Sequence, residues 1–102
     1  MSREKIADPN ELQSGDRKSV VVDDLPALLF RVDDSYYCVE DVCTHDGQPM
    51  TDGPLDGCTL TCPRHGAEFD IRDGKPLKMP ATEAIRVYDV DVVDDGIYAV
   101  VK

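Results

Sequence analysis

Two cysteines and two histidines stand in matched pairs near the middle of the chain, in the segments Cys43-Thr-His45 and Cys62-Pro-Arg-His65. Each pair offers one thiol and one imidazole, and both histidines of the chain are used. Thiolates and imidazoles are ligands for zinc and for iron–sulfur clusters, and a cysteine beside a histidine can also act as a nucleophile. The spacing therefore indicates a metal centre or a catalytic pair.

Three chemistries compete for these four residues. Structural zinc usually takes its cysteines from one knuckle and its histidines from a helix, whereas here each pair is mixed and no helix is expected. A Cys–His pair for acyl transfer would leave the second pair unexplained. A 2Fe-2S cluster, with two cysteines on one iron and two histidines on the other, uses all four. The residues favour the cluster and leave a structural zinc module as the alternative.

The sequence around these four residues predicts β-strands. Short runs rich in β-branched and aromatic residues recur between turn residues, and no stretch of ten residues keeps a helical apolar spacing. Aspartate pairs at 23–24, 33–34 and 94–95 predict hairpin turns. We predict one all-β domain over 1–102, a small antiparallel sandwich or partly open barrel. The runs are KIA (5–7), KSVVV (18–22), ALLFRV (27–32), SYYCVE (35–40), CTLTC (58–62), AEFDI (67–71), AIRVYDVDVV (84–93) and GIYAVV (96–101).

Charge and hydropathy narrow the function classes. With 21 acidic against 11 basic residues, the formal net charge is −10, which argues against nucleic-acid binding and favours docking to basic partner surfaces. No apolar run is long enough to span a bilayer, and the N-terminus lacks the pattern of a secretory signal. We therefore expect a cytoplasmic protein without a membrane partner, in which Cys38 and Cys58 are buried thiols.

The chain resembles the Rieske-type ferredoxins, whose signature is C-x-H followed by C-x-x-H. The segments CTH (43–45) and CPRHGAEFD (62–70) match it, and GPLDGCTLTCP (53–63) and RDGKPLKMPA (72–81) resemble the neighbouring parts of the family. The likeness extends from Val39 onward. It implies a Rieske-like fold with a loop-rich cluster-binding subdomain over 43–80 and one Rieske-type 2Fe-2S cluster, whose ligands would be Cys43, His45, Cys62 and His65.

What the resemblance implies about function is electron transfer rather than catalysis. Such a protein would be a soluble, monomeric one-electron carrier between a flavoprotein reductase and a terminal oxygenase, for example an aromatic-ring dioxygenase. Partners would dock transiently at the end that carries His45 and His65. The small subunit of a nitrite-reductase-like complex shares the fold and is the alternative within the family.

Departures from the respiratory members of the family place the chain in the soluble branch. Gln48 and Arg64 stand where those members have two further cysteines, so their disulfide cannot form here. Ala67 and Phe69 replace a serine and a tyrosine that donate hydrogen bonds to the cluster. Fewer donors disfavour the reduced, more negative state, so we predict a low reduction potential. Arg64 itself would contact a partner or lie in solvent.

Two glycines follow the histidines closely. Gly47 and Gly66 would permit a positive φ or a close approach of the backbone to a cluster. Ordinary turns also recruit glycine, so their presence alone does not decide between these roles.

Overall fold

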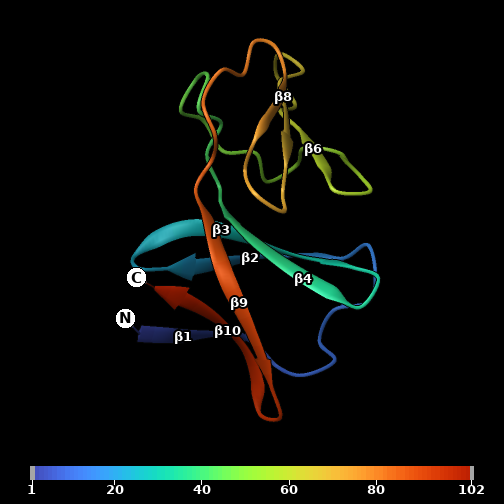
Figure 1. Cartoon of the computed structure of the whole chain (residues 1–102), viewed down its shortest axis with the longest axis vertical. Coiled ribbons are helices and arrows are strands. Elements are labelled where there is room, and N and C mark those ends of the chain that lie inside the picture. Colours follow the sequence, from blue (N-terminus) through green and yellow to red (C-terminus); the bar gives the residue numbers. More distant parts are fainter. Residues whose placement is uncertain (1, 102) are drawn as a thin grey trace.

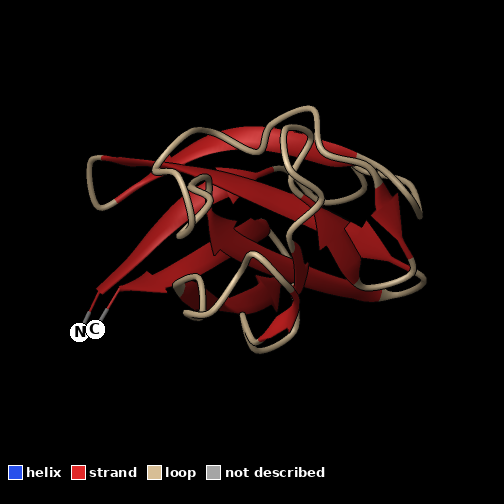
Figure 2. Cartoon of the chain, turned by 90° about the horizontal axis from the view of Figure 1, so that it is seen from above, coloured by secondary structure: helices blue, strands red, loops and turns tan. Residues whose placement is uncertain are grey.

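The computed structural model describes residues 2–101, and over this range the chain forms strands and loops without a helix (Figures 1 and 2). No described segment could therefore cross a membrane as a helix. Each predicted run overlaps a strand, which confirms the all-β prediction, whereas β5 and β8 were not predicted. The strands are β1 (Ser2–Ala7), β2 (Arg17–Val22), β3 (Leu25–Val32), β4 (Ser35–Glu40), β5 (Leu55–Asp56), β6 (Thr59–Thr61), β7 (Glu68–Asp70), β8 (Pro76–Lys78), β9 (Val87–Val93) and β10 (Gly96–Val101).

The predicted aspartate turns close hairpins of the larger sheet. Val22 pairs with Leu25, so Asp23 and Asp24 alone connect β2 to β3, and both have positive φ, 54° and 63°. Two-residue hairpins favour this left-handed conformation because its twist matches that of the strands, and aspartate tolerates it better than most residues. The sequence signal for these turns is therefore the aspartate pair itself.

Six antiparallel strands form one curled sheet in the order β1-β10-β9-β4-β3-β2. Its two edge strands, β1 and β2, approach each other across a seam. The Lys18 Nζ atom of β2 donates a 3.0 Å hydrogen bond to the carbonyl of Ile6 in β1, and the backbone nitrogen of Asp23 donates to the Glu4 carboxylate. The sheet is thus an incompletely closed barrel, in agreement with the prediction.

Strands β5 to β8 form a second, smaller sheet in chain order, at the opposite end of the long axis from the β9–β10 turn (Figure 1). This sheet lies within the predicted 43–80 subdomain, although the exact boundaries of that unit stay a prediction. Strand β9 begins at Val87, three residues after the start of the predicted run, because the backbone nitrogen of Ile85 donates instead to the carbonyl of Gly74.

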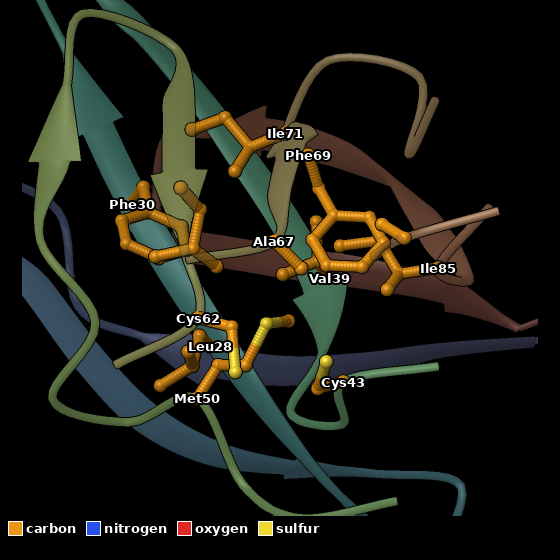
Figure 3. Packing of buried hydrophobic residues seen from close by; sticks show 12 residues of the cluster. Leu28, Phe30, Val39, Cys43, Met50, Cys62, Ala67, Phe69, Ile71 and Ile85 are labelled. Atoms are coloured by element: carbon orange, nitrogen blue, oxygen red, sulfur yellow. The ribbon is translucent and has the colours of Figure 1, made fainter. Parts of the chain in front are cut away.

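Strand β3 separates two hydrophobic cores. Leu28 and Phe30 face the core shared with the smaller sheet, while Ala27 and Leu29 face the interior of the barrel. All four are buried, as alternation along a strand with both faces covered requires. The smaller sheet contributes Phe69 to the shared core, whose packing Figure 3 shows. Cys43 and Cys62 belong to this core, so the Cys/His region packs directly against it.

Candidate metal centre

The first Cys/His loop comprises residues 43–48, shortly after the end of β4. The backbone nitrogen of Cys43 donates to the carbonyl of Gln48 at 2.8 Å, and the nitrogen of Gly47 donates to the carbonyl of Cys43 at 2.7 Å. Gly47 has φ of 73°, in the left-handed region. Two internal hydrogen bonds therefore close the loop on itself, with His45 at its tip.

The second Cys/His loop, residues 62–67 between β6 and β7, repeats this backbone pattern. The nitrogen of Cys62 donates to the carbonyl of Ala67 at 2.7 Å, and the nitrogen of Gly66 donates to the carbonyl of Cys62 at 3.2 Å. Gly66 has φ of 76°, and a Cβ built on it would meet nothing within 4 Å. Backbone conformation rather than crowding therefore favours glycine here, which confirms the positive-φ prediction.

The two loops bring their thiols together against the shared core. Cys43 and Cys62 are fully buried, and their sulfur atoms lie within 4.8 Å of each other. Figure 3 shows both sulfurs at the margin of the hydrophobic cluster, with Met50 beside Cys62. Burial raises the pKa of the Cys43 thiol above its ordinary value. Thiolates in such a place require a nearby positive charge, which a bound metal ion supplies.

The two imidazoles lie together on the outer side of the same loops. His45 and His65 are exposed, and their ring centroids are 5.3 Å apart with an interplanar angle of 82°. One ring nitrogen of each lies within 4.8 Å of the other. The predicted site residues are thus brought together as a buried thiol pair and an exposed imidazole pair.

This arrangement fits a binuclear cluster better than a single zinc ion. Among the described residues, the potential ligand atoms gather in two groups, one with both thiols and one with both imidazoles. A tetrahedral zinc ion would need all four donors around one point, at bond lengths of about 2.0–2.3 Å. A cluster with two cysteines on one iron and two histidines on the other needs two separate pairs. The donor set therefore fits a 2Fe-2S cluster.

Asp46 is a site residue that sequence reasoning missed. Its carboxylate accepts two hydrogen bonds from Arg64, at 2.7 Å from Nε and 3.1 Å from Nη2, and one from the Gln48 nitrogen. The guanidinium of Arg64 holds the pKa of the Asp46 carboxyl well below its usual range. Arg64 therefore contacts the first Cys/His loop while remaining exposed, and its contact with a partner stays a prediction. The signal available was the opposite charge of one residue in each loop.

A buried carboxylate, also unpredicted, binds the segment that directly follows the first loop. Asp41 accepts hydrogen bonds from the backbone nitrogen of Met50 and from the hydroxyl of Thr51. Arg17 of β2 donates to the carbonyls of Thr51 and Gly53, at 3.0 and 2.7 Å. Charged groups of the larger sheet and its edge thus fix the segment that follows the first loop.

The remaining candidates lie outside the donor groups. Cys38 is buried in the barrel core, as predicted, whereas Cys58 is only half-buried beside the shared core, so the prediction of a buried thiol is wrong there. Ala67 and Phe69 are fully buried, and neither side chain carries a hydrogen-bond donor. These two positions therefore offer no hydroxyl to the thiol pair, and their effect on a reduction potential stays a prediction.

The chain is similar in sequence and in structure to proteins that bind Rieske 2Fe-2S clusters and to ferredoxins. The Rieske 2Fe-2S domain family matches residues 2–89. Ferredoxin CarAc of Metapseudomonas resinovorans is 34% identical over 95 residues, which cover 92% of this chain and 89% of that protein. The structure of the ferredoxin of carbazole 1,9a-dioxygenase from Nocardioides aromaticivorans IC177 superposes with a TM-score of 0.92 at 27% identity, covering 100% of both chains.

A second similar structure contains a ferredoxin together with another protein. It is the complex of reduced oxygenase and oxidized ferredoxin in carbazole 1,9a-dioxygenase. The matching chain superposes with a TM-score of 0.87 at 33% identity, covering 95% of this chain and 91% of that one.

Proposed function

The chain belongs to the Rieske 2Fe-2S domain family, and from this premise we propose that it is a one-electron carrier of an oxygenase system. It holds one Rieske-type 2Fe-2S cluster. Two thiolates bind one iron and two imidazoles bind the other. The ligands are Cys43, His45, Cys62 and His65.

One observation carries this proposal: a buried pair of thiols lies behind an exposed pair of imidazoles, on two loops with the same backbone. The cluster, when bound, accepts and releases a single electron. The buried cysteines keep its inner side away from water, against the shared core. His45 and His65 present their ring edges to solvent, where a docked protein can approach them closely.

The electron acceptor that we propose is a terminal oxygenase of the ring-hydroxylating kind. One superposed structure is the ferredoxin of carbazole 1,9a-dioxygenase, and another is a complex of an oxygenase with its ferredoxin. A flavoprotein reductase supplies the electron. Both partners dock transiently at the His45/His65 end, one after the other, and the carrier works as a monomer. The net charge of −10 favours basic docking surfaces on both.

A pair of single substitutions tests the ligand assignment. We expect Cys62→Ser to purify with far less iron and without the visible absorption of the wild-type protein, because a serine hydroxyl is a poor ligand at this position. Cys38→Ala is the matched control, since Cys38 is equally buried but lies in the barrel core. Iron content and absorption that survive in Cys62→Ser would overturn the assignment.

Electron transfer is tested by mixing the reduced protein with a ring-hydroxylating oxygenase under anaerobic conditions. We expect the carrier to be reoxidised while the oxygenase gains one electron for each carrier molecule consumed. A carrier that keeps its electron with every oxygenase of this kind, but loses it to another class of acceptor, would contradict the proposed partner.

A further inference from the structure

The two Cys/His loops are joined to each other through one arginine. Arg64 of the second loop donates hydrogen bonds from Nε and Nη2 to the two carboxylate oxygens of Asp46 in the first loop. Its remaining terminal nitrogen, Nη1, donates a 2.7 Å hydrogen bond to the carbonyl of Pro49. One side chain therefore makes three hydrogen bonds from one loop to the other loop and the residue that follows it.

The backbone itself leaves the relative position of the loops less firmly fixed. Each loop is closed by its own internal hydrogen bonds. The first loop follows β4 of the larger sheet, whereas the second connects β6 to β7 of the smaller sheet. No strand pairing among the described residues joins β4 to β6 or β7. The distance between the loop tips thus depends on packing of the shared core, on the backbone hydrogen bond from Thr61 to Pro54 beside the second loop, and on side-chain contacts.

The geometry of the Arg64–Asp46 contact suits this role. A planar guanidinium that donates two parallel hydrogen bonds to a carboxylate fixes orientation as well as distance, which a lysine cannot do. Asp46 is oriented from its own side by the Gln48 nitrogen, at 3.0 Å. The Asp46 side chain is only 17% exposed, so water competes weakly for its oxygens.

The position of Asp46 makes the contact more consequential. One of its oxygens lies within 4.8 Å of the thiol pair, and one lies within 4.8 Å of the imidazole pair. The contact between the two loops therefore lies next to both donor pairs.

We propose that Arg64 and Asp46 form a positioning clamp, which holds the two Cys/His loops at the separation that the cluster requires. The clamp rests on the proposed function, because it acts on the cluster through the loops and does not bind it. Neither residue is a ligand. Loss of either partner breaks the Arg64–Asp46 contact, so the effects of the two substitutions should not multiply.

The test uses the full, cluster-loaded chain in four variants: Arg64→Gln, Asp46→Asn, the double variant, and Arg72→Gln as the control. Arg72 makes the same forked contact with Asp70, at 3.0 and 2.7 Å, but within one short segment of the smaller sheet. The measured quantity is the rate at which visible absorption is lost to an iron chelator. We expect each single variant to lose its cluster about tenfold faster than wild type, and the double variant to match the singles.

The control variant should stay within about twofold of wild type, because its ion pair joins residues two apart in one segment and does not connect the two Cys/His loops. The EPR spectrum of the reduced protein gives a second readout that a general loss of stability would not change. We expect altered g values in Arg64→Gln and Asp46→Asn, and unchanged values in Arg72→Gln. Arg64→Lys, which keeps the charge without the fork, should fall between wild type and Arg64→Gln.

Three results would overturn the clamp: release rates of both single variants close to wild type, single effects that multiply in the double variant, or equal effects in the control. If a single variant assembles no cluster, unfolding of its apo-protein decides. A wild-type unfolding temperature supports positioning, whereas a lowered one shows a general folding defect and counts against it. A wild-type protein without iron would instead contradict the proposed function.

Discussion

The carboxylate of Asp41 accepts a 2.6 Å hydrogen bond from the backbone nitrogen of Met50, which ties together the two ends of the segment that contains the first Cys/His loop. The second carboxylate oxygen accepts from the hydroxyl of Thr51. Asp41 is only 7% exposed, and its own backbone nitrogen donates to Pro26 of β3. The larger sheet therefore holds the loop through one buried acid.

Substitution of this acid should destabilise the protein. We expect Asp41→Ala to lower the free energy of unfolding by about 1–3 kcal/mol, because the Met50 amide and the Thr51 hydroxyl lose a charged acceptor in a buried place. Urea unfolding of the apo-protein, followed by circular dichroism, measures the change. Asp52→Asn is the control, since Asp52 is exposed nearby. Equal stability of Asp41→Ala and wild type would show that the loop is held by packing alone.

Two glycines in the metal-binding region should differ in their tolerance of alanine. A Cβ at Gly53 would lie 2.2 Å from the carbonyl oxygen of Thr61 in β6, so the backbone would have to move. At Gly66 only the left-handed backbone is strained, at about 1–2 kcal/mol. We expect Gly53→Ala to cost about 3 kcal/mol, clearly more than Gly66→Ala, in the same unfolding experiment. The reverse order would contradict the close approach.

The sequence predicted those parts of the fold whose cause is local. Alternation and aspartate turns identified the strands of the larger sheet, because each signal lies within a few residues. Strands β5 (Leu55–Asp56) and β8 (Pro76–Lys78) were missed because neither contains a β-branched or aromatic residue, and β8 begins with Pro76. Only the neighbouring strands of the smaller sheet make these segments strands.

The candidate site was also predictable only in part: its four donor residues were predicted, and its two supporting acids were not. Its four donors carry their chemistry in their own types and spacing. Asp41 and Asp46 do not, because an acid is unremarkable in a chain with 21 of them until its partners are known. Met50, Thr51 and Arg64 become those partners only after the chain has folded. Burial of one acid and pairing of the other are tertiary properties.

The two cysteines outside the site should differ in reactivity. Burial raises the pKa of the Cys38 thiol to about 12, so in the folded protein this thiol stays protonated well above neutral pH. Since the thiolate is the nucleophile, we expect Cys38 to resist iodoacetamide at about pH 8, while half-buried Cys58 is modified first. Mass spectrometry of the native, cluster-loaded protein measures both. Both thiols should react after denaturation; equal rates in the native protein would contradict the burial of Cys38.

The raised pKa of Cys38 also makes the free energy of unfolding depend on pH. The thiol ionises near its ordinary value in the unfolded chain but only near pH 12 in the folded one. The unfolded state therefore loses this proton first, and the free energy of unfolding should fall as pH rises through the interval from about 9 to 12. Apo Cys38→Ala should show a shallower fall there than apo wild type. Parallel curves for the two proteins would show that Cys38 does not contribute.

The reduction potential should lie toward the low end of the range of roughly −150 to +300 mV found for Rieske centres. The reason is the pair of buried side chains at Ala67 and Phe69, which offer no hydroxyl to stabilise added negative charge. Potentiometric titration of the purified protein measures it. A value well above zero would mean that other donors replace the missing hydroxyls.

The most direct test of the account is a visible and EPR spectrum of the anaerobically purified protein before and after dithionite, with iron and zinc counted in the same sample. We predict a red-brown protein with two irons for each chain. On reduction, its EPR signal should have an average g below that of clusters with four cysteine ligands. A colourless protein with one zinc ion would contradict the Rieske centre and with it the proposed transfer of electrons.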